Sequence, residues 1–408
     1  MELRMERKGA WPLSADVAAH ILRVQAKHAD LVKVRIVGRS VQKRPIYAVT
    51  VTDPRRHDED KQHVLIAGGH HGNEESGRMV ALALLDWLVT RPAEETVAKQ
   101  KIVIMPCVNP DGAETNSYLN VNRIKINYDF VPDRPTRSPE ARALKKVARA
   151  LQPEVFVDLH AAGGVGCGVD MVLFPWTRDY TEDARMLHRM AEDMAAAGEK
   201  AGIPQLLHPL TWHGWGGPGR DSAACTLWHY DQFKSIVFMT ENTESDEHAY
   251  PWKLRARAGL AKLKALLAWG NRRHPRLPYE GYPCMLACSM FDRGVVAFGE
   301  TAARRRASRV AIWSQAAAFR RINYRLPQPC DRKVMVLDYQ GALLRDCVGL
   351  QSLVQGRREV KRVTLDGRRV GRTGRHGFVT WHAGRMTFVM VPVPELKRGE
   401  HEMAMVFE

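Results

Sequence analysis

Continuous apolar runs alternate with amphipathic stretches through the first 270 residues of the chain. Within these runs the polarity does not alternate, as expected of strands that are covered on both faces. The runs are Val64–Gly69, Ile102–Pro106, Val155–Leu159 and Ser235–Thr240. The stretches between them place apolar residues three and four positions apart, which predicts helices. These helices are Gly77–Val89, Pro139–Leu151 and Asp183–Ala201. The pattern predicts an α/β domain whose sheet is buried between helices.

The character of the chain changes after a basic amphipathic segment, Trp252–Gly270, which we expect to be a packing helix. A proline-rich stretch follows at His274–Pro283. Beyond Arg325, short apolar runs are separated by Asp-Gly and glycine-rich turns, which is typical of a small antiparallel β domain. We therefore expect an α/β domain over residues 1–275, a linker with a helical connector over 276–325, and a basic, β-sandwich-like domain over 326–408.

Composition places the protein among ordinary globular proteins, with 45% hydrophobic and 26% charged residues. Charges interrupt the first 27 residues every few positions, so we expect neither a signal peptide nor a transmembrane segment. The seven cysteines are scattered, which argues against a disulfide framework and favours reduced thiols. These features together predict a cytoplasmic protein.

The net charge of +16 is concentrated near the C-terminus, because residues 301–408 hold 21 Lys+Arg against 9 Asp+Glu. Such an excess would suit an acidic polymer as a partner, although a solvated basic surface is the commoner explanation. The arginine runs at Arg304–Arg306 and Arg357–Arg362 lack interleaved aromatic residues. We therefore do not expect a nucleic-acid partner.

Candidate chemistry follows the ends of the predicted strands, where ligands bind in open α/β sheets. His71 and Glu74 form an H-x-x-E pair after the first run, and Gly72 between them permits a sharp turn. His160 directly follows the third run, and Asp158 lies two residues earlier, where it can orient a metal-bound histidine. Two histidines and one glutamate with an open fourth position are the ligands of a catalytic zinc site.

A zinc hydrolase also needs a proton acceptor, and Glu241 stands at the end of the fourth run. Glu244 is the competing candidate. Taken singly, His71 and His160 are better explained as hydrogen-bonded turn histidines, and Glu241 as a capping carboxylate. Their convergence from separate strand ends is what favours a shared site.

Several motifs in a fixed order resemble those of the zinc metallocarboxypeptidases, the carboxypeptidase A-like zinc peptidases. The resemblance covers about Gly38 to Trp269. Its motifs are GRSVQKRPIYAVTV (Gly38–Val51), GGHHGNEESG with the H-x-x-E pair, NPDG (Asn109–Gly112), SPEARAL (Ser138–Leu144), DLH (Asp158–His160) and LWHYDQFKSIVFMTE (Leu227–Glu241). It implies a three-layer α/β/α catalytic domain with a mixed, mainly parallel sheet. It further implies one Zn²⁺ per chain, held by His71, Glu74 and His160, with Glu241 as general base. His70 is not the motif's ligand, because Asn73 lies three residues after it.

The chain departs from this family at substrate recognition. Where the family usually reads D-L-N-R-N-F, this chain reads K-I-N-Y-D-F from Lys125 to Phe130. Asn127 is retained, but Tyr128 replaces the Arg that normally holds a substrate's terminal carboxylate, and Lys125 replaces an Asp that usually supports a zinc-bound histidine. A phenol does not reproduce the bidentate contact of Arg. Arg123 is a candidate replacement, with a surface role as the alternative.

Three further substrate-binding candidates come from the last part of the resemblance. The segment His213–Ala224, where the family carries a mobile active-site Tyr, contains no Tyr here. Its Trp215 and Arg220 are candidate replacements. Thr226 matches a position that often lines the specificity pocket, and its small uncharged side chain does not suggest a preference for a basic terminal residue.

The sequence therefore predicts a zinc-dependent hydrolase of a peptide bond, most simply a metallocarboxypeptidase. The altered recognition segment keeps open an amidase or deacylase acting on N-acyl amino acids or cell-wall-type peptides. A third reading, from a different class, is a non-catalytic protein of the same fold whose basic C-terminal domain binds a polyanion.

Overall fold

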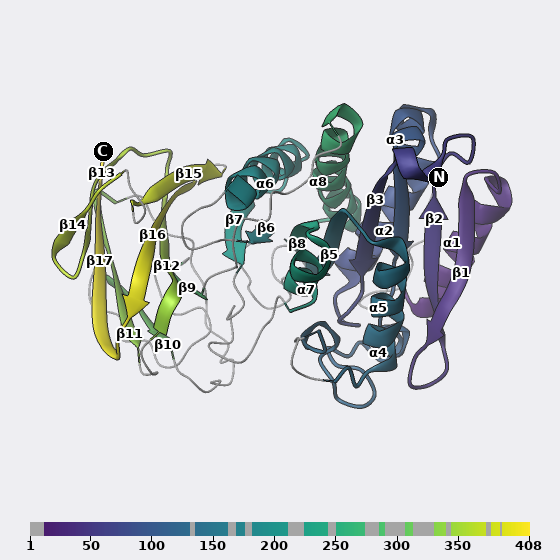
Figure 1. Ribbon diagram of the computed structural model, residues 1–408, viewed down its shortest axis with the longest axis horizontal. Coiled ribbons are helices and arrows are strands. Elements are labelled where there is room, and N and C mark those ends of the chain that lie inside the picture. Colours follow the sequence, from purple (N-terminus) through teal and green to yellow (C-terminus); the bar gives the residue numbers. More distant parts are fainter. Residues whose placement is uncertain are drawn as a thin grey trace.

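The computed structural model describes most of the chain, with gaps between the described segments (Figure 1). These segments are residues 12–130, 135–161, 169–175, 182–210, 224–243, 250–273, 285–289, 307–312, 330–339, 344–372, 377–383 and 386–408. The helices are α1 (Ser14–Lys27), α2 (Glu75–Leu88), α3 (Glu94–Lys99), α4 (Pro110–Thr115), α5 (Pro139–Leu151), α6 (Glu182–Lys200), α7 (Ala224–Phe233) and α8 (Trp252–Arg273), with short 3-10 turns η1 (Asp58–Asp60), η2 (Arg91–Ala93) and η3 (Ile126–Tyr128).

The strands of the first region form one twisted sheet. They are β1 (Val32–Arg39), β2 (Pro45–Val51), β3 (Gln62–Gly68), β4 (Gln100–Met105), β5 (Val155–Ala161), β6 (Asp170–Pro175), β7 (Gln205–Leu210) and β8 (Ile236–Asn242). Their order in the sheet is β1-β2-β4-β3-β5-β8-β6-β7. The four strands β4, β3, β5 and β8 at the centre run parallel, while β1, β2 and the β6–β8 pairing are antiparallel. The predicted mixed, mainly parallel sheet is confirmed, and the four apolar runs are its adjacent central strands.

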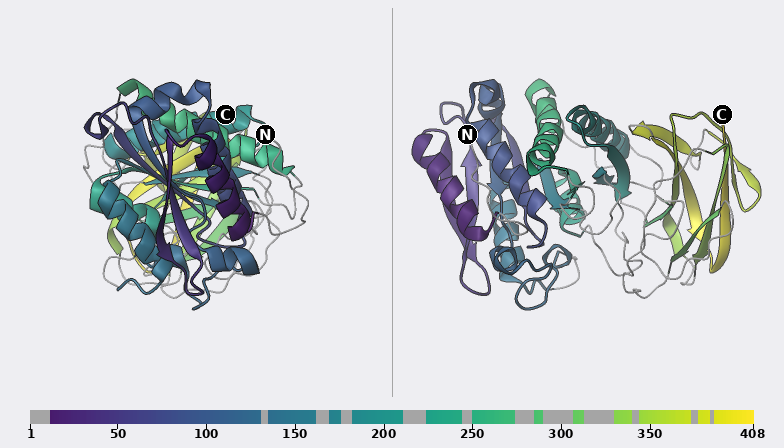
Figure 2. Two further views of the ribbon diagram at one scale, coloured as in Figure 1. Left: turned by 90° about the vertical axis from the view of Figure 1, so that its right-hand side faces the viewer. Right: turned by 180° about the vertical axis from the view of Figure 1, so that it is seen from behind.

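Helices cover both faces of this sheet, as Figure 2 shows. Leu159 of β5 faces α2, and α8 packs against both α2 and α6. Phe156 of the same strand points the opposite way and stacks on His229 of α7, with ring centroids 3.5 Å apart. Lys145 of α5 lies over the Trp228 ring of α7, so α5 shares that second face. The sheet is therefore covered on both faces, as the apolar runs predict, and the three-layer arrangement that the resemblance implies is present.

Local sequence signals explain where two of these helices begin. Ser138 caps α5 by accepting a hydrogen bond from the Ala141 amide, and Pro139 occupies the first turn, where no amide hydrogen is needed. Asn109 caps α4 in the same way and is also followed by a proline. The helices predicted at Gly77–Val89, Pro139–Leu151, Asp183–Ala201 and Trp252–Gly270 correspond to α2, α5, α6 and α8.

The C-terminal region is built from two smaller sheets. Their strands are β9 (Met285–Ser289), β10 (Ala307–Ile312), β11 (Arg332–Tyr339), β12 (Leu344–Gln355), β13 (Val360–Leu365), β14 (Arg368–Val370), β15 (Val379–Ala383), β16 (Met386–Leu396) and β17 (Gly399–Phe407). The sheets have the orders β10-β11-β17-β13-β14 and β15-β16-β12-β9. Met335, Leu350 and Met403 belong to one apolar cluster drawn from both sheets, as in a β-sandwich. The expected all-β region is confirmed.

The segment between the two regions differs from the helical connector that we expected. Its described parts, β9 and β10, are strands. β9 pairs in parallel with β12, and β10 pairs in parallel with β11. Both therefore join the C-terminal sheets, a long-range pairing that local periodicity does not reveal.

One edge of the sandwich packs on the α/β region (Figure 1). Trp381 of β15 lies edge-on to His188 of α6, with ring centroids 5.0 Å apart, and is buried in the same apolar cluster as the central sheet. His188 in turn stacks on Phe174 of β6. None of the helices in the described part of the chain is long and apolar enough to cross a membrane.

Candidate active site

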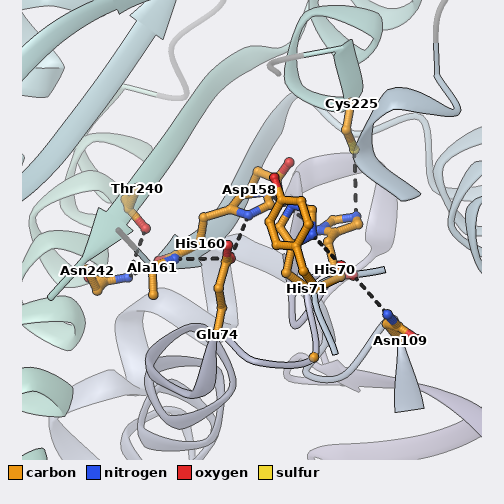
Figure 3. Close-up of polar contacts among 12 residues, drawn as sticks. His70, His71, Glu74, Asn109, Asp158, His160, Ala161, Cys225, Thr240 and Asn242 are labelled. Atoms are coloured by element: carbon orange, nitrogen blue, oxygen red, sulfur yellow. Dashed lines mark hydrogen bonds and ion pairs between the residues drawn. The ribbon is translucent and has the colours of Figure 1, made fainter. Parts of the chain in front are cut away.

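Three buried side chains from separate elements meet at the carboxyl ends of β3 and β5 (Figure 3). His71 follows β3, Glu74 is the N-cap residue of α2, and His160 lies in β5. One potential ligand atom from each lies within 4.8 Å of the other two. His160 Nδ1 is 2.9 Å from Glu74 Oε2, an oxygen that also accepts a hydrogen bond from the Ala161 amide. The predicted ligands are thus brought together in space.

The remaining nitrogen of each histidine is held by a specific partner. His71 Nδ1 donates to the Tyr118 carbonyl at 2.8 Å, so its Nε2 keeps a lone pair for a ligand. His160 Nε2 lies 3.1 Å from Asp158 Oδ1, which leaves Nδ1 facing Glu74. Such outer partners fix the tautomer and the orientation of metal-binding imidazoles.

The electrostatics of this cluster suit a divalent cation. Burial lowers the pKa of His71 to about 3, so the ring is neutral, as a metal ligand must be. Burial opposes ionisation of Glu74, but the two imidazoles hold the pKa of its carboxyl below the usual range. Burial also acts against protonation of His160, yet the Asp158 and Glu74 carboxylates raise its pKa well above normal. A cation would take the place of that proton, and this set of two imidazoles and one carboxylate fits zinc.

The backbone of the segment 71–74, which carries the candidate ligands His71 and Glu74, is held in place by close contacts. The Gly72 amide donates to the Ser117 carbonyl, and a Cβ added to Gly72 would lie 1.9 Å from the Gly112 carbonyl carbon. Glycine is therefore needed here for close approach to α4. The fully buried Arg78 guanidinium donates to the Gly72 carbonyl at 2.8 Å and to that of Glu74 at 3.4 Å. These bonds place the loop on the first turns of α2.

Glu241 lies beside this cluster on the neighbouring strand. In the parallel pairing of β5 with β8, it is the register partner of His160. Its side chain is partly exposed. Loss of solvation raises the pKa of its carboxyl to about 8, with the nearby Glu74 acting in the same direction and His160 opposing it. The competing residue Glu244 lies outside the described residues.

A second buried group surrounds Asp158, on the side away from Glu74. His70 Nδ1 lies 2.8 Å from Asp158 Oδ1, and His70 Nε2 lies 3.9 Å from the Cys225 sulfur. Cys225 comes from α7, and sequence motifs did not single it out. Asp158 therefore faces two histidines, and their charges hold its pKa well below normal although burial opposes this. His70 supports the site through Asp158 and lies outside the His71 cluster.

The substrate-binding candidates differ in how deeply they are buried, and two of them lie outside the described residues. Asn127 is buried in η3, and Tyr128 is half-buried beside it. Arg123 is exposed on a turn with a φ of 57°. Thr226 is fully buried, with its hydroxyl 3.5 Å from Asp158 Oδ2. Arg220, like Trp215, falls outside the described residues.

Two residues near the cluster were not assigned a role from the sequence. The Tyr118 ring stacks on His71, with centroids 3.8 Å apart and planes inclined by 10°. Lys125 places its ammonium over Tyr118 and Tyr128. Lys125 stands out in the sequence as a departure from the family motif, whereas Tyr118 carries no local signal.

Comparisons with known proteins find zinc carboxypeptidases similar to part of this chain. A family model described as zinc carboxypeptidase matches residues 17–126. Carboxypeptidase SOL1 of Arabidopsis thaliana is 28% identical over 170 residues, which cover 38% of this chain and 33% of that protein. Cytosolic carboxypeptidase 6 of Mus musculus is 26% identical over 149 residues, covering 34% and 28% respectively. The chain thus spans about a third or less of these relatives' lengths.

Solved structures extend the likeness of fold beyond the residues matched by sequence. A metallo-carboxypeptidase from Burkholderia cenocepacia has a TM-score of 0.51 and 21% identity, covering 62% of this chain and 68% of that one. Carboxypeptidase A from Helicoverpa armigera has a TM-score of 0.52 and 15% identity, covering 64% and 73%. The resemblance to the zinc carboxypeptidase family that the motifs indicated is therefore confirmed, by sequence over residues 17–126 and by fold over 62% of the chain.

Proposed function

We propose that this protein is a zinc metallocarboxypeptidase, which hydrolyses the amide bond before the C-terminal residue of a peptide. The observation that carries the proposal is the buried cluster of His71, Glu74 and His160, with Glu241 as the strand neighbour of His160. The names of the relatives support the reaction class, since each is a carboxypeptidase.

The metal would be held by one imidazole nitrogen from each histidine and by the Glu74 carboxylate. Zinc in such a site supplies Lewis acidity to a carbonyl and lowers the pKa of a water molecule. The Tyr118 carbonyl and Asp158 keep the two imidazoles oriented. Because both orienting groups are fixed before substrate arrives, the site requires little reorganisation.

Glu241 would move the proton during hydrolysis. A cation in the neighbouring site favours its ionised form, which is the form that accepts a proton from the attacking water. The same carboxyl group then delivers the proton to the leaving amine. Its partial exposure leaves it accessible to substrate, whereas the three metal ligands are buried. Asn127, in the adjacent turn, would orient the polar end of the substrate.

The test compares zinc-reconstituted wild type with Glu241→Gln on a panel of peptides, with products identified by mass spectrometry. We expect wild type to release single C-terminal residues, and a chelator to abolish this activity. Glu241→Gln should bind about one zinc per chain but lose about 10²- to 10⁴-fold in kcat, because only the proton transfer is removed. Undiminished hydrolysis by Glu241→Gln would refute the assigned base. Cleavage confined to N-acyl amino acids would refute carboxypeptidase activity.

A further inference from the structure

The structure places an unassigned cation beside the candidate active site. Lys125 Nζ lies 4.0 Å from the centroid of the Tyr128 ring and 4.8 Å from that of Tyr118. Tyr128 occupies the sequence position of the arginine that the family uses to hold a carboxylate. The phenol cannot bind an anion as an arginine does, but its ring face holds a lysine ammonium in position.

Tyr118 connects this ammonium to the metal cluster. One face of its ring stacks on His71, and its carbonyl accepts the His71 Nδ1 proton. Lys125 and the candidate metal ligand His71 thus contact the same aromatic side chain. The carboxylates of Glu74 and Glu241 are close enough to favour the charged form of Lys125, although burial lowers its pKa to about 8.

No described carboxylate forms an ion pair with this lysine. Within the described part of the chain, its ammonium contacts the two ring faces, and no carboxylate lies within ion-pairing distance. Ring faces do not use all three N–H donors of an ammonium group. A half-buried cation with spare donors is well suited to bind an anion that arrives with a ligand.

We infer that Lys125, whose ammonium lies over the rings of Tyr118 and Tyr128, binds the free C-terminal carboxylate of the substrate. The inference rests on the proposed peptidase function and names the group that recognises the peptide end. A single ammonium makes a point contact rather than a bidentate one, so it requires the negative charge but constrains its orientation weakly. Arg123, by contrast, is exposed on a turn.

The experiment uses pairs of peptides that differ only in a C-terminal carboxylate or a C-terminal amide. For wild type we expect kcat/KM to be about 10- to 100-fold higher on the acid, the range of one charge-assisted hydrogen bond. Lys125→Met should remove most of this preference by raising KM for the acid, and Lys125→Arg should retain part of it. Lys146→Met removes the same charge from an exposed position of α5 and is the matched control. Zinc content should be unchanged in all variants.

Binding measurements separate this inference from the proposed reaction. Calorimetry on zinc-loaded Glu241→Gln gives the affinity for each acid and amide without turnover. A preference for the acid that Lys125→Met removes in this background supports the subsite, even if the wild type hydrolyses no peptide. Equal affinities for acid and amide would overturn the inference even if hydrolysis is confirmed. Loss of the preference in Arg123→Met, with Lys125→Met unaffected, would also overturn it.

Discussion

The eight-stranded sheet and the C-terminal sandwich are both apolar inside, but they differ in the buried ionisable groups that they hold. The central sheet region buries His71, Glu74, Asp158 and His160 at adjacent strand ends. In the described part of the sandwich, the buried polar side chains are those of Lys333, Ser352 and Thr387. Parallel strands end at one edge and can bring such groups together, whereas antiparallel strands end alternately at opposite edges. From this comparison we expect the chemistry in the central sheet region, and the variants below test whether the sandwich contributes packing alone.

The largest expected effect is at the metal cluster. His160→Ala removes one ligand, takes away the imidazole that contacts Glu74 Oε2, and leaves Asp158 with His70 as its remaining histidine partner. We expect the loss of zinc affinity to exceed the roughly 100-fold cost of changing an orienting residue. Zinc content after dialysis, measured by elemental analysis, checks this. Retention of one tightly bound zinc would show that the cluster is not the metal site.

Trp381→Ala tests whether the sandwich contributes packing alone. Removing the indole leaves a cavity against His188 of α6, and we expect the free energy of unfolding to fall by about 3–5 kcal/mol. Denaturant unfolding measures the loss. Zinc affinity should stay at the wild-type value, and a parallel loss of metal would show that the two regions are coupled.

Asp158→Asn weakens the support behind the metal ligands without removing one. The amide keeps the shape of the side chain but loses the charge shared by His70 and His160. Zinc affinity should fall about 10- to 100-fold, as measured by competition with a chelator. An unchanged affinity would mean that the orientation of His160 is set by Glu74 alone.

Acid should destabilise the junction between the regions through His188. Burial lowers its folded-state pKa from 6.5 to about 4, so the unfolded chain takes up the proton first as the pH falls. The contribution of the neutral, buried His188 to the free energy of unfolding is therefore fully present above pH 6.5 and is lost between pH 6.5 and 4. About 2 kcal/mol of it is lost from pH 7 to pH 5.

The matched measurement is denaturant unfolding of wild type and His188→Leu at both pH values. Because the buried His71 and His229 also titrate, the expected signature is a smaller loss in the variant than in wild type. Equal losses would show that His188 does not contribute to the acid sensitivity.

Local sequence was sufficient for the elements that carry the candidate site. Continuous apolar runs marked β3, β4, β5 and β8 to within two residues at each end, because buried parallel strands have no polar face. His71 and Glu74 lie a few residues after the first of these runs. His160 and Glu241 directly follow the third and fourth runs. Strands β9 and β10 were not predicted by the same reasoning, because they pair with strands that lie much later in the chain.

The sequence by itself determined the central strands, the helices α2, α5, α6 and α8 around them, and the identity of the metal-binding candidates. The tertiary structure alone decided which groups surround these candidates. They are the carbonyl and ring of Tyr118 against His71, the Cys225 sulfur beside His70, and the tyrosine ring under the Lys125 ammonium. The physical reason is one of range. Periodicity records which face of an element is buried, whereas contacts between distant segments depend on how the whole chain packs.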